Sequence, residues 1–175
     1  MPTLPVNRLG VTATTLLLVA LGSPRPVVGE GVVPMPRIRT NQSNVATLIE
    51  RGREHSSTFR ALLETIEASD GIVYVETGRT CHGRHACLVM SVTMAGRNRI
   101  LHVLVDSSAS DADLIGSLGH ELRHVIEVLS DPTVRSDADI YNFYLRNYPS
   151  ADPRNFETTA AIQAGIDVRA ELIGR

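Results

Sequence analysis

The segment covering residues 114–129 carries apolar side chains at steps of three and four along the chain. On an α-helix this spacing gathers them into one stripe, which predicts an amphipathic helix with one buried face. Ser110 is expected to cap the helix, with Asp111 and Asp113 at the positive end of its dipole. The polar residues 130–132, which end in a proline, are expected to terminate it. The rest of the chain must therefore supply a core that covers this helix.

Two histidines of this segment, His120 and His124, lie four residues apart. Both imidazoles then project from the same side of the helix, one turn apart. This spacing suits two nitrogen ligands of one tetrahedral zinc ion, with bonds of about 2.0–2.1 Å. Glu121 points elsewhere and can reach a water on the ion without binding the ion itself. The alternative is a surface helix with two solvated histidines, although this composition gives only about 0.01 accidental HExxH matches.

A catalytic zinc site needs a third protein ligand and one position left for water. We expect Glu157 to be that ligand, because it heads the apolar stripe of a last helix that runs from about Phe156 to Ile173. A carboxylate on a buried stripe is costly unless it is paired or binds a metal. The alternative is an acidic first-turn residue stabilised by the helix dipole. Competing carboxylates are Asp131, Asp137, Asp139 and Glu127.

Glu127 follows His124 by three residues, so we expect it either to partner that histidine or to lie on the surface. Gly116 and Gly119 weaken a helix and therefore predict the close approach of another backbone or of a ligand. The last predicted helix is rich in alanine and glycine, which would let it approach the central helix closely.

The chain of 175 residues is 43% hydrophobic, has a net charge of −2 and shows no repeat, which allows one domain with a moderate core. The charge offers no basic field for nucleic acid. Residues 1–29 are typical of a secretory signal peptide, with Arg8 before an apolar run from Val11 to Leu21. That run is shorter than the roughly 20 residues of a stable membrane span. We therefore expect an exported protein with no stable span after cleavage, the alternative being an uncleaved membrane anchor.

Residues 30–42 are proline-rich and are expected to be a linker outside the fold, so the domain covers residues 43–175. Residues 44–69 predict two helices with Ser56 or Ser57 as a cap between them. Three β-branched runs then predict a three-stranded antiparallel sheet in a meander, with a hairpin turn at residues 95–98. A short helix is expected within residues 133–148. The predicted fold class is α+β; its strands are residues 72–77, 87–94 and 99–105.

The two cysteines, Cys81 and Cys87, flank a short loop within the predicted sheet. In an exported chain the first interpretation is a disulfide that closes this loop. His82 and His85 in the same loop raise the alternative of a Cys/His metal site, but the spacing matches no standard zinc pattern.

The pentad of residues 120–124 resembles the signature of zincins, the zinc metallopeptidases that carry HExxH on a helix. It is most similar to the gluzincin type, in which a glutamate from a later helix is the third ligand, and Glu157 matches that position by pattern. The metzincin pattern HExxHxxGxxH does not match, because Glu127 and Ser130 replace its glycine and third histidine. The chain also resembles small exported bacterial proteins of unassigned function that carry an HELxH helix and end in a Phe-Glu-Thr type helix, over most of residues 43–173.

This resemblance implies that Zn²⁺ held by His120, His124 and Glu157 activates a water, with Glu121 as the general base for hydrolysis of a peptide or protein substrate. It also implies that the substrate lies along an edge strand, which would be residues 99–105. Two other functions stay open: a zinc-binding domain of the same fold without catalysis, and a partner-binding exported domain in which the pentad is incidental. Residues that could stabilise an oxyanion, or simply pack in a core, are Tyr141, Tyr144 and Tyr148.

Overall fold

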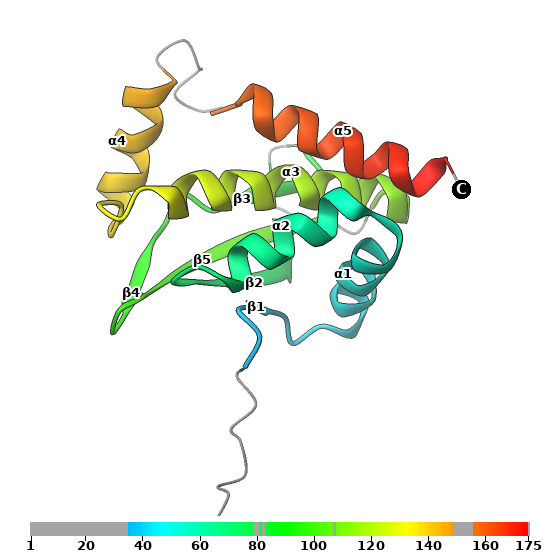
Figure 1. Ribbon diagram of the computed structural model, residues 1–175, viewed down its shortest axis with the longest axis horizontal. Coiled ribbons are helices and arrows are strands. Elements are labelled where there is room, and N and C mark those ends of the chain that lie inside the picture. The colour runs from blue at the N-terminus through cyan, green and yellow to red at the C-terminus, as the bar shows by residue number, and fades with distance from the viewer. Residues whose placement is uncertain (1–34, 79–80, 82, 107, 149–155, 175) are drawn as a thin grey trace, which may run out of the picture. The chain divides into compact units, whose positions relative to one another are not determined.

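The computed structural model describes residues 35–78, 81, 83–106, 108–148 and 156–174. The expected signal peptide, residues 1–29, lies outside these residues. The described chain is α+β, as predicted, with five helices and a mixed sheet of five strands (Figure 1). In chain order the elements are β1 (Ile38–Arg39), α1 (Ser43–His55), α2 (Ser57–Glu67), β2 (Gly71–Thr77), β3 (Ala86–Leu88), β4 (Thr93–Ala95), β5 (Asn98–Val105), α3 (Asp111–Ser130), α4 (Asp137–Asn147) and α5 (Thr159–Ile173).

The sheet has the strand order β1-β2-β5-β3, and β4 pairs with β5 on the same side as β3. β1 and β5 both run parallel to β2, whereas β3 and β4 run antiparallel to β5. The predicted three-stranded antiparallel meander is therefore wrong. After β2 the chain crosses to the far edge and returns through the hairpin at Gly96, which has a φ of +62°. This path inserts β5, whose residues alternate between buried and half-buried, into the centre of the sheet.

The run at residues 87–94, predicted to be one strand, is interrupted between β3 and β4. Leu88 pairs with Val103 and Thr93 pairs with Ile100, so the edge side has two more residues than β5 between these pairs. The resulting bulge is held by Asp137 at the start of α4, whose carboxylate accepts hydrogen bonds from Val92 N and the Ser91 hydroxyl at 2.9 Å each. Because of this interruption, β3 packs beside α3, whereas β4 pairs with β5 in the hairpin.

Part of the segment expected to be a linker belongs to the sheet. Ile38 in β1 pairs with Val73 and is only 9% exposed, and the Arg37 carbonyl accepts a hydrogen bond from Val73 N at 2.8 Å. Glu67 at the end of α2 accepts hydrogen bonds from Arg37 N. The domain therefore begins before residue 43, because a buried isoleucine and a short parallel pairing anchor residues 37–39.

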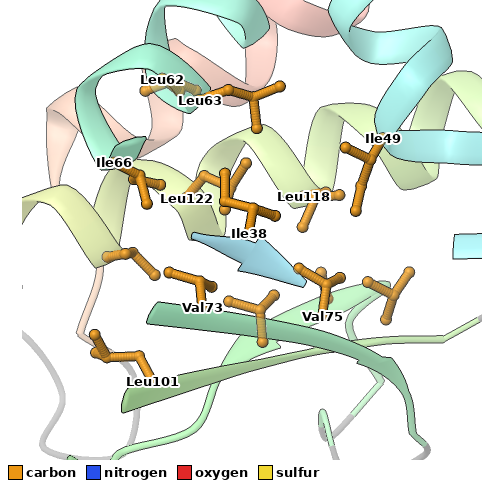
Figure 2. Close-up of a cluster of buried hydrophobic side chains, with 14 of the residues drawn as sticks. Ile38, Ile49, Leu62, Leu63, Ile66, Val73, Val75, Leu101, Leu118 and Leu122 are labelled. Carbon is orange, nitrogen blue, oxygen red and sulfur yellow. The ribbon is translucent and has the colours of Figure 1, made fainter. Parts of the chain in front are cut away.

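One face of the sheet packs against α1, α2 and α3 and forms the core (Figure 2). Val73 and Val75 of β2 and Leu101 of β5 face Leu118 and Leu122 of α3, and all five side chains are buried. The break between α1 and α2 falls at Ser56, whose hydroxyl accepts a hydrogen bond from Phe59 N at 2.9 Å and so caps α2, as predicted. Within the part of the chain that the structure describes, none of the helices combines the length and the hydropathy that a membrane span requires.

The two ends of α3 are fixed by polar contacts. Ser110 caps its start by accepting a hydrogen bond from Asp113 N, as predicted. At its end Arg99 of β5, with a side chain only 3% exposed, pairs with Asp70 at 2.7 Å. The same guanidinium donates hydrogen bonds to four carbonyl oxygens at or just after the last turn of α3, those of Val128, Leu129, Asp131 and Val134. A buried cation at a helix C-terminus is stabilised by both the dipole and the unpaired carbonyls.

Replacing Arg99 by methionine should lower the free energy of unfolding by about 3 kcal/mol, because several buried carbonyls lose their donor. Urea denaturation measures this change. Arg97→Met, at an exposed arginine in the neighbouring turn, is the matched control and should shift stability by no more than about 0.5 kcal/mol. Equal stability of the two variants would contradict the role of Arg99.

A second polar contact joins α5 to the start of α2. Glu171 of α5 accepts hydrogen bonds from the hydroxyls of Ser56, Ser57 and Thr58 and from Thr58 N, at 2.6–3.1 Å. Burial raises the pKa of this carboxyl, but the hydrogen bonds outweigh it and lower the pKa to about 2. A carboxylate at the start of α2 is also favoured by the helix dipole.

Folding lowers the pKa of Glu171 from 4.5 to about 2. Between these two pH values the folded state therefore binds fewer protons than the unfolded state. Its stabilising effect is present above pH 4.5 and should be lost as the pH falls towards 2. Glu171→Gln should cost about 1 kcal/mol at pH 7 and flatten this part of the pH profile of urea denaturation. Glu64→Gln, at an exposed glutamate of α2, should retain the slope.

Candidate metal centre

Three potential metal ligands converge beside the middle of α3. The Nε2 atoms of His120 and His124 lie 3.1 Å apart. One carboxylate oxygen of Glu157, Oε2, lies 2.9 Å from the first and 4.0 Å from the second. Two ligand atoms on a tetrahedral ion with bonds of 2.0–2.1 Å are ~3.3 Å apart, so the three separations bracket the expected value. His120, His124 and Glu157 form the group that could hold a metal ion among the described residues.

The electronic state of these atoms also favours a cation between them. His124 Nδ1 lies 3.0 Å from Glu127 Oε2, so a proton on Nδ1 leaves a lone pair on Nε2, which faces the other two ligand atoms. Glu157 Oε2 is buried and has no hydrogen-bond donor in suitable geometry, despite its proximity to His120. Lone pairs packed this closely repel one another unless a proton or a metal cation lies between them. The donor set therefore fits a metal ion.

Glu121, the predicted general base, lies beside this group without joining it. Its Oε2 accepts a hydrogen bond from Leu88 N on β3 at 2.8 Å, and its Oε1 lies 3.8 Å from His120 Nε2. Burial raises the pKa of this carboxyl, while the neighbouring histidines and the Leu88 hydrogen bond lower it; burial outweighs them. A carboxylate with a raised pKa is closer to the range in which it can accept and release a proton near neutrality.

The charged groups at the site shift one another's pKa values. Burial lowers the pKa of His120, but the carboxylates of Glu157 and Glu121 outweigh it and raise the pKa above its usual value. Contact with His120 lowers the pKa of Glu157 to about 2, against burial and with help from Arg84. Glu157 is therefore an anion at neutral pH, which is the state that binds a metal.

The residues directly before and after Glu157 fix its position. The predicted helix start at Phe156 is wrong: α5 begins at Thr159, and Thr158 is its cap, accepting a hydrogen bond from Ala161 N at 3.0 Å. Glu157 therefore precedes the helix instead of heading it. Phe156 stacks on Tyr144 of α4, with ring centroids 5.0 Å apart. The segment that carries the carboxylate is thus anchored to α4 before it and to the helix cap after it.

Thr158 also links Glu157 to His124. Its hydroxyl, in a residue only 3% exposed, donates to Glu127 Oε1 at 2.7 Å, while Glu127 Oε2 contacts His124. The expectation that Glu127 partners His124 is confirmed. The chain His124–Glu127–Thr158 therefore orients one imidazole and positions the residue next to Glu157.

The disulfide between Cys81 and Cys87 is confirmed, with Cα atoms 5.4 Å apart. The sulfur atoms of both cysteines are bonded to each other, so neither is a free thiolate, and the alternative Cys/His metal site in the same loop is wrong. His82 lies outside the described residues. Within the loop Arg84 forms an ion pair with Glu157 Oε1. The loop closed by the disulfide therefore binds one oxygen of Glu157 and leaves the other facing the histidines.

Glycines allow α5 to lie directly on α3, as predicted (Figure 1). A Cβ atom on Gly116 would lie 3.2 Å from the carbonyl oxygen of Gly165, and one on Gly119 would lie 2.9 Å from the Val168 side chain. A Cβ atom on Gly165 would lie 3.1 Å from His120 Cβ. The two helices therefore meet almost backbone to backbone, and this brings the chain segment before α5 to the histidines.

A cleft of about 360 Å³ opens on the site between α3, α5 and the residues around the start of β3. Among its lining residues are the candidate ligands His120 and Glu157 and the candidate base Glu121. The expectation that residues 99–105 form the substrate edge is wrong, because β5 is paired on both sides. The edge near the site is β3, where the backbone N–H of Leu88 points to Glu121.

The other carboxylates considered as ligands are engaged elsewhere. Asp131 contacts Thr133 after the end of α3, Asp137 holds the bulge in the sheet, and Asp139 accepts a hydrogen bond from the Ser136 hydroxyl at the start of α4. Among the tyrosines, Tyr144 is buried and donates to the carbonyl oxygen of His124 at 3.4 Å. Tyr144 therefore serves packing beside the site.

Sequence reasoning missed two side chains that position the site. Thr158 could have been recognised, because threonine directly before a helical run is a common N-cap. Arg84 carried no local signal, since its partner lies far along the chain. The comparisons with known proteins add no family: no family model, no curated protein and no solved structure matches the chain.

If His120, His124 and Glu157 hold a metal ion, Glu127→Gln should weaken its binding about 10- to 100-fold, with Zn²⁺ as the probe ion, because the neutral amide no longer holds the His124 imidazole as firmly in the required orientation and tautomer. Competition against a zinc chelator measures this affinity. Glu64→Gln should bind as tightly as the unmodified protein. An unchanged affinity of Glu127→Gln would show that Glu127 does not orient a ligand.

Proposed function

We propose that this protein is an exported zinc-dependent metallopeptidase of the zincin type. The observation that carries the proposal is the convergence of His120, His124 and Glu157 beside the buried carboxylate of Glu121, at a cleft. Two histidines and one glutamate are a ligand set of catalytic zinc sites, which leave one position for water. A purely structural zinc site would have four protein ligands, and the described residues supply three.

When bound, zinc acts as a Lewis acid that polarises a peptide carbonyl and lowers the pKa of water to about 7. Glu121 is suited to take a proton from the attacking water and to return it to the departing amine. Leu88 N holds one oxygen of this carboxylate, so the other is oriented towards the histidines. Burial of the site strengthens the electrostatic interactions on which this proton transfer depends.

The substrate in this proposal is a peptide segment lying along β3. An edge strand offers backbone hydrogen-bonding groups to an added extended chain. The His85 carbonyl accepts a hydrogen bond from Asp106 N, and Val89 N donates to the His102 carbonyl. The backbone groups of His85 and Val89, on either side of β3, are therefore directed towards β5. By strand alternation, the backbone groups of Ala86 then face the cleft, on the same side as Leu88 N.

Export is the remaining part of the proposal. Residues 1–29 would act as the signal peptide, and the Cys81–Cys87 disulfide is typical of chains that fold in an oxidising compartment. The disulfide would then be present when the site forms, which is important because its loop contacts Glu157 through Arg84.

The purified protein should bind one zinc ion per chain and cleave peptides in a mixed library. Glu121→Gln should retain zinc, because the amide oxygen that replaces the carboxylate can still accept the Leu88 hydrogen bond, and should cleave at least about 100-fold more slowly. Metal analysis and mass spectrometry of the products measure the two properties, with Glu64→Gln as control. Zinc without cleavage in the unmodified protein would favour the non-catalytic alternative, and cleavage by Glu121→Gln at the normal rate would overturn the proposed mechanism.

A further inference from the structure

Two exposed isoleucines of α5 line the same cleft as the candidate metal centre. Ile162 is 45% exposed and Ile166, one turn further, is 56% exposed. Neither is needed for the contact of α5 with the core, which is made by buried residues on another face of the helix. Those buried residues are Ala161, Ala164 and Val168.

The position of these isoleucines follows from the close helix contact. Gly165 lies between them in sequence and approaches His120 so closely that a Cβ atom there would be 3.1 Å from the His120 Cβ. The segment of α5 that carries Ile162 and Ile166 is therefore the segment nearest the first histidine. An apolar surface adjoins the position at which the scissile bond would lie.

The opposite side of the cleft includes His85 and Ala86, at the start of the edge strand β3. Successive side chains of an extended peptide point to opposite faces. In a peptide lying along β3, every second side chain would therefore point to the same side. One such side chain beside the scissile bond would reach the cleft wall made by α5.

Four of the charged residues that line the cleft form two ion pairs. Asp113 and Arg169 pair with each other, and Arg84 pairs with Glu157. Each pair has no net charge and therefore attracts a charged substrate side chain only weakly. Burial of the apolar surface of a substrate gains roughly 25 cal/mol per Å².

We infer that Ile162 and Ile166 form a subsite that selects peptides with a large apolar side chain next to the cleaved bond. This inference rests on the proposed function, because it assigns the specificity of the same site. The substrate class is an extended polypeptide with leucine, isoleucine, methionine or phenylalanine at that position.

The test uses the full chain as purified, loaded with zinc, and a random peptide library. Products released by the unmodified protein should be enriched in large apolar residues on one side of the cleaved bond. Ile166→Asp should lower this preference roughly tenfold or more, since a single methylene in such a pocket is worth about 10- to 200-fold. Ile173→Asp is the matched control, because Ile173 is 58% exposed on the same helix and does not line the cleft.

A second arm makes the inference independent of turnover. Zinc-loaded Glu121→Gln protein is immobilised, and the peptides that it captures are sequenced with and without Ile166→Asp. Apolar enrichment that is lost in Ile166→Asp and retained in Ile173→Asp supports the subsite. Cleavage or capture without apolar enrichment overturns the subsite and leaves the peptidase proposal intact. Absence of cleavage together with apolar capture that is lost in Ile166→Asp overturns the peptidase proposal and retains Ile162 and Ile166 as an apolar peptide-binding subsite, whereas apolar capture that Ile166→Asp retains overturns the subsite.

Discussion

The contact of α5 with the backbone of α3 is the interaction on which the candidate centre depends. Gly116, Gly119 and Gly165 remove the side chains that would separate the helices. In a helix each glycine costs about 1 kcal/mol relative to alanine, so this arrangement sacrifices local helix stability for proximity. The result is that Glu157, near the end of the chain, reaches two histidines in its middle.

Proximity alone does not fix the direction of a carboxylate. Phe156 is stacked on α4, and Thr158 is bound both to its own helix and to Glu127. Arg84 holds the oxygen of Glu157 that does not face the histidines. Each of these contacts restricts a different part of the segment, and together they hold Oε2 of Glu157 in a buried position that faces both histidines. Preorganisation of this kind is typical of ligands that must bind an ion without a large conformational cost.

The sheet contributes to the site through its edge. The bulge held by Asp137 separates β3 from β4, and β3 then places Leu88 N against Glu121. At the other end of the same helix, Arg99 binds the last carbonyls of α3. The sheet therefore fixes both the orientation of α3 and the direction of the Glu121 side chain, so the histidines and Glu121 have defined positions relative to the sheet.

Much of the local structure was determined by the sequence alone. The ends of α3, the break between α1 and α2 at Ser56, the hairpin at Gly96 and the disulfide follow from periodicity, capping and turn chemistry, which act between residues close in the chain. The pairing of His120 with His124 follows from helix geometry in the same way. Only the tertiary structure decided that β5 runs parallel to β2, that β3 is the edge and that Arg84 and Thr158 position Glu157. These contacts join residues far apart in sequence, and which surfaces meet depends on how the whole chain buries its apolar area, a quantity that no local pattern contains.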